Sequence, residues 1–210
     1  SAGVLTFASA PDYETKTSYT ATVTASNGIN AENSGVIVNV TDVNESPVFT
    51  SSASFNVEEN QTAIGSVSAT DPESETLIFA VSGSDLAIDS SSGVLTFVTA
   101  PDFETQAAYT ATVTASDGEN TTTQVVNINV TDVNEAPTIT SSASFSVEEN
   151  QTAIGTVTAT DADDDEVTFT ISGSELEITS AGVLTFASAP DYETKTSYTA
   201  TVTASDGENT

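Results

Sequence analysis

The sequence repeats itself with a period of about 90 residues, which limits the chain to copies of one small domain. A Pro-Asp-aromatic-Glu motif places its aspartate at Asp12, Asp102 and Asp191, which are 90 and 89 residues apart. The segment TDVNE begins at Thr41 and again at Thr131. Such a period is longer than one turn of a solenoid and fits a whole domain. We therefore expect tandem copies of one domain, with one role repeated.

Proline marks the predicted boundaries of the repeats. DVNESP ends at Pro47 and DVNEAP ends at Pro137. Proline donates no hydrogen bond to a sheet and extends the residue before it, so these segments suit linkers. Residues 1–47 then form the C-terminal part of a repeat with its linker, 48–137 a complete repeat with its linker, and 138–210 a repeat without its last strand. We expect the chain to be a segment of a longer array.

Within a repeat the hydrophobic pattern has a period of two. Apolar residues alternate with threonine over residues 109–115, and Val126, Ile128 and Val130 alternate with asparagine. This alternation is typical of strands that are buried on one face. Similar runs and turn signals predict about seven strands per repeat. No segment combines the apolar stripe of a helix with helix-capping residues. The sequence predicts an all-β chain of β-sandwiches joined end to end.

Composition excludes most classes of function. The formal net charge is −29, with Lys16 and Lys195 as the only basic residues, and the chain has no His, Cys, Met or Trp. Imidazole and thiol catalysis, disulfides and ordinary zinc or haem sites are therefore excluded, and an enzyme is not expected. Nucleic acid and anionic membranes would be repelled, and no apolar run has transmembrane length. A metal cation remains as the partner of opposite charge.

The acidic residues cluster at predicted strand ends and loops, which gather at the two poles of a sandwich. The lower pole of one repeat faces the upper pole of the next across the proline linker. Residues expected to meet at the second linker are Glu59, Asp102, Glu104, Asn134, Glu135, Asp161, Asp163 and Asp206. Without a cation so many carboxylates would repel one another. Oxygen ligands at this density favour Ca²⁺ over Mg²⁺, which prefers to keep its waters.

The ordered set of motifs resembles tandem cadherin repeats of the bacterial or marine cadherin-like kind. The resemblance covers the whole chain and rests on VEEN (57–60), DPE (71–73), DAD (161–163), PDFE (101–104), ASDGEN (115–120) and TDVNEAP (131–137). It implies seven-stranded Greek-key sandwiches of the cadherin and Ig-like type, joined end to end, with Ca²⁺ in each linker. The linker DVNEAP is one residue shorter than the usual family linker and has Glu in place of Asp.

The resemblance also implies which residues bind the metal. At the second linker they are Glu59, Asp102, Glu104, Asp132, Asn134, Glu135, Asp161, Asp163 and Asp206. At the first linker they are Asp12, Glu14, Asn44, Glu45, Asp71, Glu73 and Asp117. Asn27 stands where the other repeats have Asp117 and Asp206, so a site that used it would be weaker.

The function implied is that of a calcium-binding segment of an extracellular adhesin, on the cell surface or secreted. Ca²⁺ would stiffen the array for cell adhesion, with neighbouring repeats, another copy of the adhesin or a cell-surface ligand as partners. A passive spacer and a carbohydrate-binding module remain open as alternatives, and the acidic clusters could instead be solvated charge. Because 138–210 lacks a last strand and residues 36–40 belong to one, we also expect head-to-tail association by strand donation.

Overall fold

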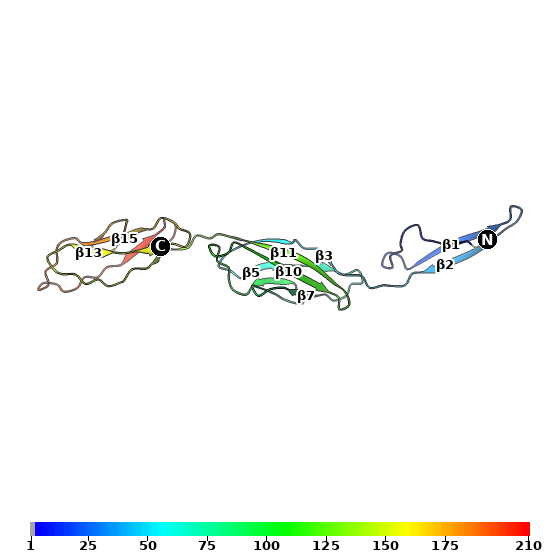
Figure 1. Cartoon of the computed structure of the whole chain (residues 1–210), viewed down its shortest axis with the longest axis horizontal. Helices are drawn as coiled ribbons and strands as arrows, with labels where there is room; N and C mark the ends of the chain where they lie inside the picture. Colours follow the sequence, from blue (N-terminus) through cyan, green and yellow to red (C-terminus); the bar gives the residue numbers. More distant parts are fainter. Residues whose placement is uncertain (1–2) are drawn as a thin grey trace. The chain divides into compact units, whose positions relative to one another are not determined.

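The computed structural model describes residues 3–210, and none of these residues is helical. The chain therefore contains no helix that could cross a membrane within this described part. It divides into two compact units, Ser1–Pro101 with Ala107–Val130 and Asp102–Gln106 with Thr131–Thr210. Figure 1 shows the strands in sequence colours. The predicted all-β class is confirmed, whereas the predicted boundaries of the three repeats stay a prediction.

The central region, residues 48–131, is a β-sandwich. One sheet has four strands in the order β4-β11-β10-β7, a second has the order β5-β9-β8, and β3 pairs with β6. The strands are β3 (Val48–Phe49), β4 (Ser54–Glu58), β5 (Ala63–Ser66), β6 (Ala69–Thr70), β7 (Ile78–Val81), β8 (Leu86–Ile88), β9 (Val94–Phe97), β10 (Ala108–Ser116) and β11 (Thr121–Thr131). Residues 48–58 thus contribute strands to two sheets, with β3 beside β6 and β4 beside β11.

The core of the central region follows the alternation read from the sequence. Val113 on β10 and Val126 and Ile128 on β11 have no exposed surface, and Leu95 on β9 packs from the other sheet with the same full burial. Each of these side chains is worth about 1.5–3 kcal/mol of hydrophobic free energy when it is fully buried. The inward faces of β9, β10 and β11 therefore hold this sandwich together.

The N-terminal region, residues 3–47, contains one antiparallel hairpin. It consists of β1 (Ser18–Ser26) and β2 (Ala31–Asn39), paired from Ser18 opposite Asn39 to Ser26 opposite Ala31. Its apolar side chains are poorly covered, with Val23 44% and Ile37 69% exposed. An isolated two-stranded hairpin is marginal in water, and nothing in this region supplies a second layer over it.

The C-terminal region, residues 138–210, repeats much of the central sandwich with fewer strands. They are β12 (Thr138–Ile139), β13 (Ala153–Thr156), β14 (Ala159–Thr160), β15 (Thr168–Ile171), β16 (Leu176–Ile178), β17 (Val183–Phe186) and β18 (Val202–Ser205). The sheets are β13-β17-β16, β15-β18 and β12-β14, around a core of Val157, Phe169, Leu184 and Ala204. Residues 144–148, which correspond to β4, form no strand.

Candidate metal sites at the two linkers

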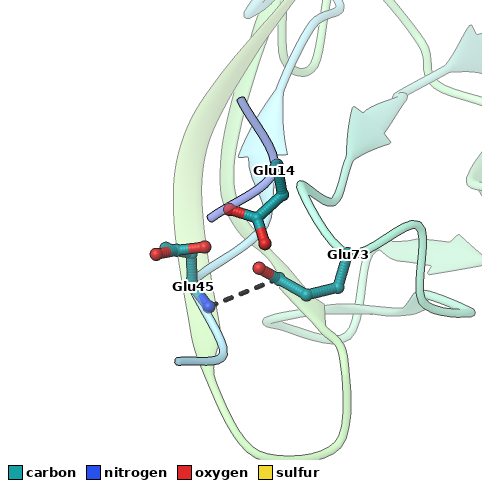
Figure 2. Close-up of side chains that lie close together, drawn as sticks. All are labelled: Glu14, Glu45 and Glu73. Carbon is teal, nitrogen blue, oxygen red and sulfur yellow. Dashed lines mark hydrogen bonds between the residues drawn. The ribbon is translucent and has the colours of Figure 1, made fainter. Parts of the chain in front are cut away.

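Three glutamates meet at the first linker. Glu14 lies in the turn before β1, Glu45 in the segment between β2 and β3, and Glu73 in the turn after β6. One carboxylate oxygen from each lies within 4.8 Å of the other two, and Figure 2 shows the three side chains together. The backbone N–H of Glu45 donates to Glu73 Oε2 at 3.3 Å. Segments far apart in sequence thus bring three negative charges into one small volume.

The crowding of these carboxyl groups changes their acidity. A hydrogen bond shared with the Glu73 carboxyl, together with burial and the charges of Glu73, Glu14 and Asp12, raises the pKa of Glu45 to about 7. A hydrogen bond from its own N–H lowers the pKa of Glu14, but burial and the carboxylates of Asp42 and Glu73 outweigh it and raise that pKa. The ionised forms of Glu14 and Glu45 are therefore disfavoured unless a cation compensates their charge.

Asparagine side chains fix the first linker to the neighbouring turn between β10 and β11. Asn44 Nδ2 donates to Asp117 Oδ2 at 3.1 Å, and Asn120 Nδ2 donates to the carbonyl oxygen of Asn44 at 3.0 Å. Asp117 Oδ1 accepts the N–H groups of Glu119 and Asn120. Burial opposes ionisation of Asp117, but these bonds to Asn120, Glu119 and Asn44 outweigh it and keep its pKa below the usual value.

Buried oxygen atoms without a donor distinguish this cluster from ordinary surface acids. Asp71 Oδ1 accepts the N–H groups of Glu73 and Glu75 at 3.0 and 3.2 Å. Asp71 Oδ2 and Asn44 Oδ1 are buried and have no hydrogen-bond partner in the described part of the chain. Burying such acceptors unpaired is unfavourable, and native proteins seldom do so without a water or an ion. Both atoms are suitable ligands for a hard cation.

The second linker repeats this geometry within the other unit. One oxygen each of Glu104, Glu135 and Asp163 lies within 4.8 Å of the other two. The N–H of Glu135 donates to Asp163 Oδ2 at 2.9 Å. Asp161 Oδ2 and Asp163 Oδ1 are buried and unpartnered within residues 3–210. Two independent parts of the molecule therefore build the same arrangement of acidic groups.

The second linker has the same pair of asparagine hydrogen bonds, which we call the asparagine clamp. Asn134 Nδ2 donates to Asp206 Oδ2 at 2.9 Å, and Asn209 Nδ2 donates to the carbonyl oxygen of Asn134 at 2.9 Å. The N–H of Asn209 is the main cause that lowers the pKa of Asp206, burial opposes it, and the Asn134 amide adds to the lowering. The clamp holds Asp206 ionised next to the linker.

The structure also places the other predicted ligands, which are Asp12, Asp102, Glu59 and Asp132. Asp12 accepts the N–H and hydroxyl of Thr15, and Asp102 accepts those of Thr105, so each caps its own turn. Glu59 is buried with 3% exposure, and Asp132 is exposed. The roles of these residues as metal ligands stay predictions.

Sequence reasoning missed several residues of these clusters. Asn120 and Asn209 were not singled out, although ASDGEN and ASDGENT repeat them. Asp42 was missed although its counterpart Asp132 was named. A further group in the C-terminal region, Glu149, Asp191 and Glu193, has oxygens within 4.8 Å of one another. The spacing of 89 to 90 residues from Glu59, Asp102 and Glu104 was the signal that could have found it.

Comparison with known proteins decides the family. Residues 44–129 and 134–210 match the family described as the bacterial Ig domain. The chain belongs to the bacterial Ig domain family. This bacterial Ig chain is 34% identical over 146 residues to the mouse cadherin EGF LAG seven-pass G-type receptor 1, with 63% of the chain and 5% of the receptor covered. The chain thus spans a small fraction of that relative's length.

The chain is also similar to a bacterial enzyme and to cadherin repeats of known structure. It is 31% identical over 169 residues to chitinase A of Pseudoalteromonas piscicida, covering 79% of the chain and 21% of the chitinase. Mouse cadherin-23 EC22-24 superimposes with a TM-score of 0.56 at 24% identity, covering 94% of this chain and 72% of that one. The predicted cadherin-like tandem repeats and their sandwich fold are therefore confirmed.

Proposed function

We propose that the chain is a calcium-binding, cadherin-like segment of an extracellular adhesin, displayed on a cell surface or secreted. The observation that carries the proposal is the pair of linker clusters in which buried carboxylate oxygens lack a donor, Asp71 Oδ2 at the first and Asp161 Oδ2 and Asp163 Oδ1 at the second. Solvated surface charge does not explain buried unpaired oxygens, because acids that serve solubility stay in contact with water.

The donor set fits calcium. Each cluster offers carboxylate oxygens with amide and backbone carbonyl oxygens nearby, and neither contains nitrogen or sulfur ligands of the kind that zinc selects. Ca²⁺ accepts about six to eight oxygens in variable geometry, whereas Mg²⁺ requires a near-ideal octahedron. Glu14, Glu45, Asp71 and Glu73 would bind at the first linker, and Glu104, Glu135, Asp161 and Asp163 at the second, with the remaining predicted ligands contributing around them.

Binding would change the mechanics of each linker. Without a cation, mutual repulsion opposes the close approach of the carboxylates. A divalent cation supplies compensating charge, and its ligands come from the linker and from turns before and after it. Binding to the ordered linker alone stabilises it by mass action. A stiffened array suits adhesion, with another copy or a cell-surface ligand as the partner.

Thermal unfolding tests the calcium proposal. The full chain is unfolded in chelator, in Ca²⁺ and in Mg²⁺, and we expect the Tm to rise with Ca²⁺ and to respond little to Mg²⁺. Asp71→Asn keeps the turn-capping oxygen but removes the charge, and should weaken calcium binding about tenfold. Asp85→Asn makes the same chemical change at an exposed position of the central region and should bind as the native chain does. A Tm that ignores Ca²⁺ would overturn the proposal.

Adhesion needs a separate experiment. Beads that carry the chain at one end are mixed in Ca²⁺ and in chelator, alone and with cells. Calcium-dependent clumping of the beads supports homophilic adhesion, and attachment to cells without clumping supports a cell-surface ligand. If the beads do neither while calcium still raises the Tm, the chain is a calcium-stiffened spacer.

A further inference from the structure

Asn27 is the one asparagine of this chain that is followed by glycine. The pair lies in the turn between β1 and β2, and Gly28 has a φ of 89°. Because glycine has no Cβ, a neighbouring side chain can approach its backbone nitrogen closely. The sequence therefore leaves the Gly28 nitrogen unhindered beside the side-chain amide of Asn27.

The hydrogen bonds of the turn fold the side chain of Asn27 over the backbone of Gly28. Asn27 Oδ1 accepts the N–H groups of Ile29 and Asn30 at 3.0 and 2.9 Å. These bonds run past Gly28, so they draw the side-chain carbon Cγ of Asn27 toward the Gly28 nitrogen. The N–H of Gly28 donates to Ser26 Oγ at 3.1 Å, which holds the peptide group that contains this nitrogen in place.

The same N–H groups of Ile29 and Asn30 are placed to stabilise a negative charge on the side-chain oxygen of Asn27. If a nucleophile attacks Cγ, charge moves onto Oδ1. Donors that already point at this atom stabilise the charge without rearranging. The turn therefore combines a close nucleophile with preorganised donors for the oxygen.

The other two repeats show that the turn accommodates an aspartate in place of Asn27. Asp117 and Asp206 occupy this position, and their Oδ1 atoms also accept the N–H groups of the residues two and three positions later. The glycine after each aspartate donates to a serine Oγ at 3.1 Å, as Gly28 does. An aspartate at position 27 would therefore keep the hydrogen bonds of this turn. Since the turn has the same bonds in the central region, its geometry follows from its own sequence.

We propose that Asn27-Gly28 is a site of spontaneous deamidation, which converts Asn27 into the aspartate that the other repeats have. The Gly28 nitrogen loses its proton to solvent and bonds to Cγ, and Nδ2 takes a proton from water and leaves as ammonia. Water then opens the cyclic imide at either of its carbonyls and gives aspartate or isoaspartate. The reaction consumes water, releases ammonia and changes no oxidation state. Its product adds a negative charge and the kind of oxygen with which Asp117 accepts the Asn44 amide.

Peptide mapping by mass spectrometry tests the proposal in the full chain, kept folded at mildly alkaline pH in chelator and in water enriched in heavy oxygen. We expect an acid that contains oxygen from the water to form at Asn27 before it forms at any other asparagine, as a mixture of aspartate and isoaspartate. The reaction should be at least as fast as in the same chain unfolded in guanidinium chloride, because the folded turn holds the reacting groups together.

Two results of this experiment would overturn the proposal. A slower reaction in the folded chain than in the unfolded chain would show that the turn protects Asn27. A product without isoaspartate would show that the amide is hydrolysed directly and that Gly28 takes no part. Because the experiment is done in chelator, neither result depends on calcium binding at the linkers.

Two glycine variants of the same hairpin test the role of Gly28. Gly28→Ala places a methyl group beside the attacking nitrogen and should slow the reaction at Asn27 more than about tenfold. Gly35→Ala on β2 adds the same group where nothing lies within 4 Å, and should react as the native chain does. The same contrast should hold in guanidinium chloride, so a variant that fails to fold still gives an answer. Equal rates in the two variants would contradict the role of Gly28.

Discussion

Two identical stretches of this chain have different structures. Residues 3–26 and 182–205 have the same sequence. In the C-terminal copy Val183–Phe186 is strand β17, whereas the matching residues 4–7 form no strand. In the N-terminal copy all of Ser18–Ser26 is strand β1, whereas its match is a strand only at Val202–Ser205.

The difference follows from the partners that each copy finds. β17 pairs with β13 on one side and β16 on the other, and β1 pairs along its length with β2. In residues 3–47 no strand corresponds to β13 or β16, and within residues 138–210 none corresponds to β2. Strand formation in these repeats therefore depends on neighbouring strands more than on local propensity.

The largest effect should come from one leucine in each copy. Leu184 is 6% exposed and Leu5 is 57% exposed, at equivalent positions of the identical stretch. Leu184→Ala leaves a cavity in a core and should reduce the free energy of unfolding of its unit by about 2–5 kcal/mol. Leu5→Ala should change it by no more than about 0.5 kcal/mol. Denaturant unfolding of both variants measures this, and equal effects would contradict the comparison.

Supplying the missing partner should make the copies more alike. In a chain extended after Thr210 by a copy of residues 122–131, residues 197–201 and 144–148 would gain a neighbouring strand. Hydrogen exchange should then slow at these backbone amides to rates like those of β10 and β4. Residues 4–7 gain no partner and serve as the control. Unchanged exchange at residues 197–201 would show that a partner strand is not what they lack.

The first residue at which the copies differ tests the second linker. The identical stretch is followed by Asn27 in one copy and Asp206 in the other. Asp206→Asn makes the C-terminal copy resemble the N-terminal one, and should weaken calcium binding about tenfold because the site loses a negative charge. Glu208→Gln removes the same charge two residues away and should bind normally. Calorimetric titration compares them, and equal affinities would remove Asp206 from the site.

The smallest effect is a dependence of stability on pH at the first linker without calcium. The pKa of Glu45 is about 7 in the folded chain against 4.5 for an ordinary glutamate. The folded state therefore holds a proton that the unfolded state has released, and stability falls as pH rises through about 5 to 7. Glu45→Gln should flatten this dependence, whereas Glu177→Gln on β16 should keep it. A native chain whose stability rises over this range would contradict the assignment.

Much of the fold was predictable because burial follows the sequence alternation. Val126, Ile128 and Val130 were expected to face inward, and they do. The division of residues 48–58 into β3 and β4 was not predictable, because it depends on which sheet each half pairs with. Nor was the absence of a strand at residues 144–148, because Ser-Phe-Ser-Val-Glu differs from β4 at one position.

The candidate site was predictable in composition but not in detail. The resemblance to cadherin repeats implied that Glu14, Glu45 and Glu73 act at one linker, and the structure brings these acids together. The clamp made by Asn120 depends on a hydrogen bond to a backbone carbonyl 76 residues away, which no local motif specifies. The unpartnered oxygen of Asp71 likewise depends on which donors the fold brings near it.

A crystal structure of the full chain grown in calcium chloride, with an anomalous difference map, tests the calcium assignment most directly. The account predicts ions in contact with Asp71 Oδ2 at the first linker and with Asp161 Oδ2 and Asp163 Oδ1 at the second. A map without peaks at these atoms, with water or protein donors satisfying them instead, would contradict it.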